Sequence, residues 1–171
     1  MAENGFFKNR GVPVKISKLT KSYETSAEQV KALKSVDWEI GPGEAVALMG
    51  PSGCGKTTIH NLLGGVDHAT GGEIVVGDQK LGALSERDLE KYRLFKVGFV
   101  FQFFNLIPTL TAIENLELPM LVAGVDGAGR KQRIAALLQM VGLGEKGHKR
   151  PEELSGGEQQ RVAVALALAN D

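Results

Sequence analysis

The segment Gly50–Thr57 constrains the possible folds of this chain more than any other feature. It fits the P-loop pattern, in which a glycine, four variable residues and a second glycine precede lysine and then serine or threonine. An apolar run at residues 45–49 comes before it, and residues 56–63 are typical of a helix. A P-loop needs this order of strand, loop and helix. The pattern therefore predicts an α/β core that binds a nucleoside triphosphate.

The predicted triphosphate site consists of backbone N–H groups and the side chains that follow them. Glycine permits the tight turn in which N–H groups point at phosphates, and the helix dipole adds to the attraction. Lys56 is predicted to bind the β- and γ-phosphates, Thr57 to ligate Mg²⁺, and Thr58 to contact the α-phosphate side. The predicted loop ligands are Gly50, Pro51, Ser52, Gly53, Cys54, Gly55, Lys56, Thr57 and Thr58.

Composition narrows the class of protein. The 171 residues include 20 basic and 20 acidic side chains, so no basic field favours nucleic acid. One cysteine excludes an intramolecular disulfide, which fits a reducing compartment. Residues 1–15 lack the apolar centre of a signal peptide, and no apolar run is long enough to cross a bilayer. A cytoplasmic location is therefore expected.

Five segments have the pattern of strands. Residues 12–19 and 36–40 alternate apolar and polar side chains, which predicts half-buried strands of an antiparallel sheet. Residues 45–49 are apolar on both faces, which is typical of a central parallel strand. Residues 73–76 and 97–101 are the other two candidates. An antiparallel β part beside the P-loop core is therefore expected.

Helix signals are concentrated in the second half of the chain. Capping-box patterns begin at Ser85 and at Thr111, and the helix after Thr111 is expected to be interrupted or kinked near Pro119. Residues 130–141 have apolar side chains at helical spacing, and Gly142 is placed to end that helix. A helical insert at about 103–153 follows from these patterns.

A second glycine-containing helix start lies at Leu154–Arg161. Ser155 is predicted to cap a helix over residues 156–169 while Glu158 reaches back to it. Gly156 and Gly157 leave the first turn bare, so that its N–H groups could approach a phosphate closely. An ordinary capped helix is the alternative. An ordinary capped helix does not account well for the whole segment Leu154–Arg161 in a chain that also contains a P-loop.

These motifs together resemble the nucleotide-binding domain of an ABC transporter ATPase. Leu154–Glu158 is similar to the signature motif of that family, with Glu158 where glutamine is more familiar. Gln102, after an apolar segment, resembles the Q-loop glutamine, and Tyr23 resembles the aromatic A-loop residue that stacks on adenine. The resemblance covers essentially the entire chain.

Two segments resemble one branch of that family more narrowly. Residues 100–111 and 61–67 are similar to ATPases that serve lipoprotein release and macrolide-type efflux. This likeness favours export. It also implies an integral membrane transporter subunit or domain as partner, contacted by residues around 103–125, and a peripheral place on the cytoplasmic face of the membrane.

The resemblance also implies a mechanism. Two nucleotide-binding domains, as a homodimer or pseudo-dimer, pack head to tail, and ATP with Mg²⁺ lies between the P-loop of one and the signature helix of the other. Ser155, Gly156, Gly157 and Glu158 are then ligands of the nucleotide. Lys56 and Gln102 contribute to catalysis, and Gln102 also contacts Mg²⁺ and senses the γ-phosphate.

The expected organisation is a single ABC-type domain over residues 1–171. It comprises a β-rich part at about 1–102, a helical subdomain at about 103–153 and the signature helix at 154–171. The family pattern continues with an apolar strand ending in aspartate and a catalytic glutamate, which these residues do not contain. An incomplete domain without turnover is therefore expected. A truncated, non-hydrolysing ATP-binding module and a soluble ABC ATPase are the alternatives.

Overall fold

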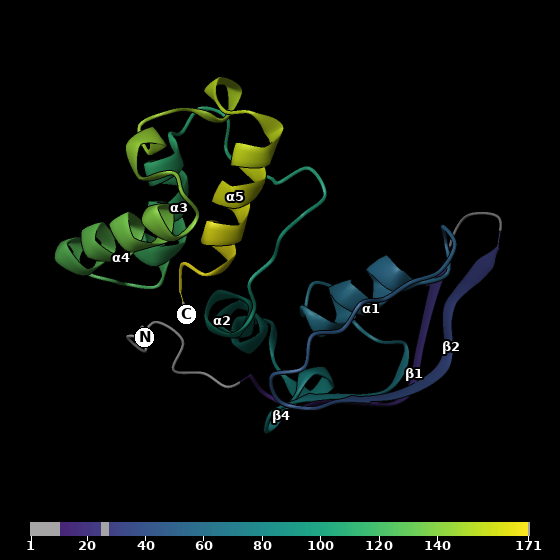
Figure 1. The fold of residues 1–171 in the computed structure, drawn as a ribbon. Coiled ribbons are helices and arrows are strands. Elements are labelled where there is room, and N and C mark those ends of the chain that lie inside the picture. Colours follow the sequence, from purple (N-terminus) through teal and green to yellow (C-terminus); the bar gives the residue numbers. More distant parts are fainter. Residues whose placement is uncertain (1–10, 25–27, 171) are drawn as a thin grey trace. The chain divides into compact units, whose positions relative to one another are not determined.

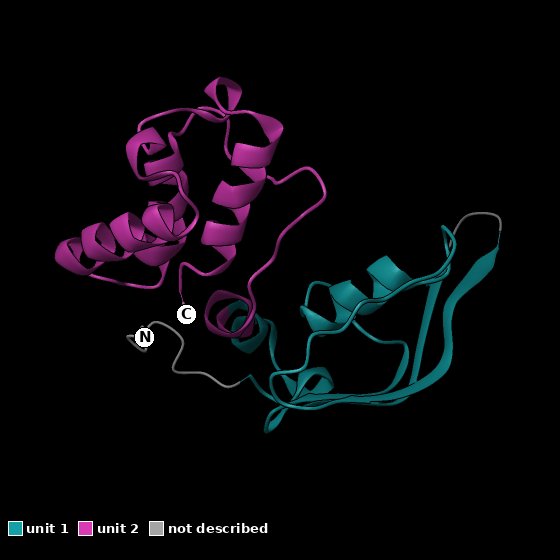
Figure 2. Cartoon of the chain, viewed as in Figure 1, with its two compact units in different colours: residues 1–90 teal, residues 91–171 magenta. Residues whose placement is uncertain are grey.

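The computed structural model describes residues 11–24 and 28–170 and forms two compact units, residues 1–90 and 91–171 (Figure 2). The boundary between these units falls inside helix α2 (Glu86–Lys96). The single-domain organisation expected for residues 1–171 stays a prediction. The expectation that no signal peptide is present depends largely on residues 1–10, which lie outside the described residues.

An antiparallel sheet of four strands forms the framework of the first unit. Its strands are β1 (Val14–Glu24), β2 (Gln29–Ile40), β3 (Gly71–Val76) and β4 (Gln79–Lys80), in the order β2-β1-β3-β4. Every neighbouring pair is antiparallel. The strands predicted from the alternation of apolar and polar residues are therefore confirmed, as is the antiparallel β part.

A bulge in β1 aligns apolar side chains that are three residues apart. Lys18 adopts a left-handed φ of 47°, and the register of β1 shifts between Ile16 and Leu19 against β2 and between Ser17 and Thr20 against β3. Its backbone N–H donates to an Asp37 carboxylate oxygen at 2.8 Å, so the donor at the bulge keeps a partner. Ile16 and Leu19 are both buried as a result. Helix α1 (Lys56–Leu63), confirmed with its predicted bounds, lies beside this sheet (Figure 1).

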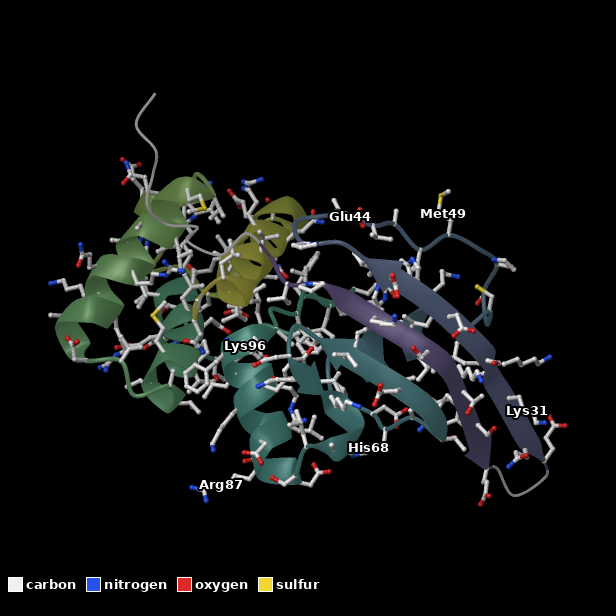
Figure 3. All side chains as sticks on the ribbon, turned by 90° about the horizontal axis from the view of Figure 1, so that it is seen from below. Lys31, Glu44, Met49, His68, Arg87 and Lys96 are labelled. Atoms are coloured by element: carbon white, nitrogen blue, oxygen red, sulfur yellow. The ribbon has the colours of Figure 1, made fainter. Side chains whose placement is uncertain are left out.

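The two predicted apolar strands at residues 45–49 and 97–101 are wrong for this structure, because neither segment forms a strand. Val46 is 48% exposed and Met49 is 91% exposed, and Figure 3 shows the Met49 side chain pointing away from the ribbon. A strand exists only where a neighbour supplies hydrogen bonds to its backbone. Within residues 11–24 and 28–170 no strand pairs with either segment.

Three helices form the core of the second unit: α3 (Ala112–Val122), α4 (Gly127–Met140) and α5 (Gly156–Ala167) (Figure 1). Buried side chains of these helices and of the segments next to them form one cluster: Ala112, Leu116, Met120, Ile134, Leu137, Leu138, Leu143, Leu154, Val162, Ala165 and Ala169. Short 3-10 turns, η2 (Gly144–Lys146) and η3 (Pro151–Glu153), connect α4 to α5. In the described part of the chain, no helix combines the length and apolar character that a bilayer crossing requires.

The predicted caps are confirmed, whereas two helix details differ from expectation. The side chains of Ser85 and Thr111 cap the starts of α2 and α3. The predicted interruption near Pro119 is absent, because α3 continues through it and its carbonyl accepts the next-turn N–H of Ala123 at 2.9 Å. Helix α4 begins earlier than predicted, since Asp126 caps it by accepting two backbone N–H groups at 2.9 Å.

Candidate functional site

The loop at residues 50–57 has the backbone conformation that its glycines predict. Gly53 and Gly55 have φ angles of 78° and 96°, in the left-handed region that glycine adopts without strain. At Gly55 there is also no room for a side chain, since a Cβ atom would lie 2.9 Å from the carbonyl oxygen of Ala32. The neighbouring strand β2 thereby fixes the point at which the loop enters α1.

Helix α1 begins without a side-chain cap. Its N-cap is Gly55, no side chain accepts from the first turn, and no acidic residue lies in that turn. The free N–H groups of a helix start carry partial positive charge and bind anions. The hydroxyl-bearing residues at this end, Ser52 and Thr57, are exposed, and Thr58 is half-buried. The start of α1 is therefore open to an anionic ligand.

The Lys56 ammonium group is held over this loop. Its Nζ atom donates to the carbonyl oxygens of Gly50 and Pro51 at 2.8 and 2.6 Å, and lies 3.5 Å from the Sγ atom of Cys54. A full positive charge therefore already lies against the carbonyl groups of the loop. Cys54 is exposed, so its thiol is a natural reporter for anything that covers this segment.

Tyr23 is oriented by two residues that the sequence did not single out. Its hydroxyl donates to a carboxylate oxygen of Asp67 at 2.8 Å, and the Lys21 ammonium lies 4.7 Å from the ring centroid. Lys21 and Asp67 also form an ion pair at 2.6 Å. Partial burial would raise the pKa of Asp67, but hydrogen bonds from Lys21 and Tyr23 contribute to a net lowering. The ring is therefore held in one orientation, with 37% of Tyr23 exposed.

Gln102 lies in an exposed loop of the second unit rather than at the end of a strand. The next residue, Phe103, is 82% exposed. Phe104 and Asn105 both have left-handed φ angles, of 60° and 50°. Two consecutive residues of this kind are rare outside glycine and turn the chain sharply. Gln102 is therefore exposed, and the backbone at Phe104 and Asn105, just after it, is conformationally constrained.

Asn115 organises the segment that follows this turn. It is 3% exposed, and its Oδ1 atom accepts from the backbone N–H of Ile107 at 2.8 Å. Its Nδ2 atom lies 3.2 Å from the carbonyl oxygen of Ile107, 3.1 Å from that of Leu110 and 2.9 Å from that of Thr111. One buried amide thus ties together backbone groups of Ile107, Leu110 and Thr111, which the sequence patterns did not reveal.

We expect Asn115→Ala to lower the free energy of unfolding by about 2 to 3 kcal/mol, because buried backbone groups would lose their partners. Urea denaturation followed by circular dichroism measures this loss. Gln132→Ala, which removes an exposed amide from α4, is the matched control and should change stability little. Equal stability of the two variants would contradict this role for Asn115.

The start of α5 has the predicted capping box. The Ser155 hydroxyl accepts from the Glu158 N–H at 3.4 Å, and the Ser155 N–H donates to a Glu158 carboxylate oxygen at 2.8 Å. Ser155, Gly156 and Gly157 are exposed. An added Cβ atom would meet nothing within 4 Å at Gly156 and only a guanidinium nitrogen of Arg161, 3.9 Å away, at Gly157. The chain itself therefore does not require glycine for space here.

Glu158 is strongly stabilised in its charged form. Its second carboxylate oxygen accepts a hydrogen bond from the Lys146 ammonium of η2. That bond, followed by those from the backbone and side chain of Ser155, lowers the pKa of Glu158 from 4.5 to about 2. A lowered pKa in the folded state adds stability above the unfolded value, and this contribution disappears as the pH falls through the folded value.

We therefore expect Glu158→Gln to flatten the acid side of the stability profile. Between pH 4.5 and about 2 the parent chain loses the contribution of this carboxylate, whereas the variant has none to lose. Thermal melting of both proteins across that pH range measures the difference. Parallel melting profiles would contradict the assignment of this pKa shift.

The predicted site residues fall into both units. The P-loop residues and Tyr23 belong to residues 1–90, whereas Gln102 and the Ser155–Glu158 segment belong to residues 91–171. Sequence reasoning missed the side chains that hold these groups: Lys21, Asp67, Asn115 and Lys146. Of these residues, only Lys21 could have been identified from the sequence. It lies two residues before Tyr23, so both side chains are on the same face of a strand.

Comparison with known proteins assigns the chain to a family. The family model described as ABC transporter matches residues 33–171. The lipoprotein-releasing system ATP-binding protein LolD of Pseudomonas fluorescens is 46% identical, over 89% of this chain and 67% of LolD. The macrolide export ATP-binding/permease protein MacB of Marinobacter nauticus is 43% identical, over 92% of this chain and 24% of MacB.

Comparison of folds agrees with the sequence match. The dimeric structure of a post-hydrolysis state of the ATP-binding cassette MJ0796 bound to ADP and Pi, from Methanocaldococcus jannaschii, has a TM-score of 0.84 and 45% identity. The match covers 92% of this chain and 69% of that one. The chain spans 64% to 72% of the length of the first relatives it matches. The chain has the α/β fold of ABC ATPases and belongs to the ABC transporter family of ATP-binding proteins.

Proposed function

We propose that this chain binds Mg-ATP at residues 50–58 and belongs to the ATP-binding subunit of an exporter. The observation that carries this proposal is the Lys56 ammonium, fixed 2.8 and 2.6 Å from two loop carbonyls at an uncapped helix start. Such a site offers a full positive charge and free N–H groups to a phosphate chain. Within this proposal, the residues act as one domain.

ATP enters this site with its phosphates against the loop. Lys56 transfers its hydrogen bonds from the two loop carbonyls to the β- and γ-phosphate oxygens, and Thr58 contacts the α-phosphate side. The ring of Tyr23 stacks on adenine, with its orientation fixed by Asp67 and Lys21. Backbone N–H groups of residues 50–57 complete the cradle.

The side chains present suit Mg²⁺. The exposed hydroxyl of Thr57 lies in the first turn of α1 and Gln102 offers an exposed amide oxygen, and both are hard oxygen donors of the kind that Mg²⁺ prefers. A bound Mg²⁺ would neutralise charge on the β- and γ-phosphates. Gln102 reports γ-phosphate occupancy to the segment that follows it.

A second copy or a second nucleotide-binding domain completes the site. The start of α5, with Ser155, Gly156, Gly157 and Glu158, contacts the phosphates held by the P-loop of the opposite copy. The solved relative with the same fold is described as dimeric and bound to ADP and Pi, which supports this arrangement. Exposed, unhindered glycines at the start of α5 allow such a close approach.

Export is supported by the names of two relatives, one a lipoprotein-releasing system protein and one a macrolide export protein. We infer an integral membrane subunit as partner and a place on the cytoplasmic face of the membrane. Residues around 103–125 are its contact region. Exposed apolar side chains there include Phe103, Leu118, Leu121 and Val122.

Nucleotide titration followed by a turnover assay tests the proposal. We expect saturable Mg-ATP binding in the micromolar to millimolar range common for enzyme substrates. Absence of binding by folded protein would contradict the proposal. Sustained phosphate release that Lys56→Ala abolishes would overturn the expectation of a domain without turnover.

A further inference from the structure

The carboxylate of Glu158 is held between the start of α5 and the preceding turn. One oxygen accepts from the backbone N–H and hydroxyl of Ser155 at 2.8 and 3.0 Å. The other accepts from the Lys146 ammonium. The Glu158 side chain is 15% exposed and that of Lys146 is 44% exposed, so the cation is the more accessible member of the pair.

This arrangement matters because of the charge at the helix start. A carboxylate in the first turn satisfies N–H groups of its own helix, but it repels an approaching polyphosphate. The Glu158 carboxylate is ionised at neutral pH, and its hydrogen bonds lower its pKa further, to about 2. Without a cation beside it, the start of α5 would present a negative charge to an anionic ligand.

Lys146 supplies the compensating charge. It lies in η2, outside the Ser155–Glu158 segment, and packing of that turn against α4 places its ammonium beside the carboxylate. Lys149, three residues later, forms no ion pair among the described residues. The pairing is therefore specific to Lys146 rather than a general property of the basic residues in this connection.

We propose that Lys146 is a positioning residue that neutralises Glu158, so that the start of α5 accepts the triphosphate held by the P-loop of a second copy. This inference rests on the proposed function. It predicts that a neutral residue at position 158 makes Lys146 dispensable. If the ion pair only stabilised the fold, the effect of replacing Lys146 on Mg-ATP-dependent dimerisation would not depend on the residue at position 158.

A double-mutant cycle tests this inference. Mg-ATP-dependent dimerisation of the full chain is measured by sedimentation equilibrium for the parent, Lys146→Met, Glu158→Gln and the double variant. We expect Lys146→Met to weaken the dimer about tenfold or more in the parent background, because an unpaired charge is left at the contact. In the Glu158→Gln background the same substitution should change dimerisation less than about threefold.

Controls separate the possible outcomes. Lys149→Met removes the same charge nearby and should leave dimerisation unchanged. Lys146→Gln repeats the test if methionine disturbs folding, which circular dichroism detects. Equal dimerisation of the parent and the folded Lys146 variants overturns this inference alone, as does an equal loss in both backgrounds. A parent chain that binds no nucleotide, or binds it without dimerising, contradicts the proposed function as well.

Discussion

We expect Lys56→Ala to lower the affinity for Mg-ATP by about 100-fold, because truncating one partner of a close charge pair costs about 2 to 5 kcal/mol. The variant should keep the fold of the parent chain, because Lys56 is only half-buried and its ammonium contacts only two carbonyls and the Cys54 sulfur of its own loop. Isothermal titration calorimetry with Mg-ATP measures the change.

The matched control is Lys31→Ala, which removes an exposed lysine from β2 of the same unit. It loses the same charge without touching the loop, so its affinity should stay within about twofold of the parent chain. Equal affinities of the Lys56 and Lys31 variants would contradict the assignment of Lys56 to the phosphate site.

We expect Gly55→Ala to destabilise the chain far more than Gly53→Ala. Both residues have left-handed φ angles, 96° and 78°, so each substitution costs about 1 to 2 kcal/mol from the backbone alone. At Gly55 the new Cβ atom also lies 2.9 Å from both the Ala32 carbonyl oxygen and a Leu33 methyl group. That overlap adds about 1 to 3 kcal/mol.

Gly53→Ala is the appropriate control for Gly55→Ala, because Gly53 has open space around it. A Cβ atom there meets nothing within 4 Å, so only the backbone strain remains. Urea denaturation of both variants measures the difference in the free energy of unfolding. If both variants lose the same stability, the close approach of β2 to the start of α1 does not constrain this loop.

Local patterns predicted the parts of the fold that depend on local interactions. The capping boxes at Thr111 and Ser155 were readable because each uses residues three positions apart. Alternating side chains identified β1 and β2 because one face of the sheet is buried and the other is solvated. The P-loop could also be predicted, because its backbone conformation depends on glycines that lie close together in the sequence.

The failures involve partners that are distant in sequence. Residues 45–49 and 97–101 have the composition of strands, yet a strand also needs a neighbour, and composition cannot supply one. The pairing of Lys21 with Asp67 spans 46 positions, and that of Lys146 with Glu158 spans 12. Such pairings depend on the packing of whole elements, so a local pattern does not identify both partners.

Protection of Cys54 by nucleotide is the most direct test of the central claim. Cys54 is the single cysteine of the chain, is exposed, and lies within the loop at residues 50–57. We predict that Mg-ATP slows its alkylation by a small maleimide about tenfold or more, because bound phosphates would block access to the thiol. Lys31→Ala should retain this protection and Lys56→Ala should lose it. An unchanged alkylation rate at saturating Mg-ATP, in protein shown by circular dichroism to be folded, would contradict the account.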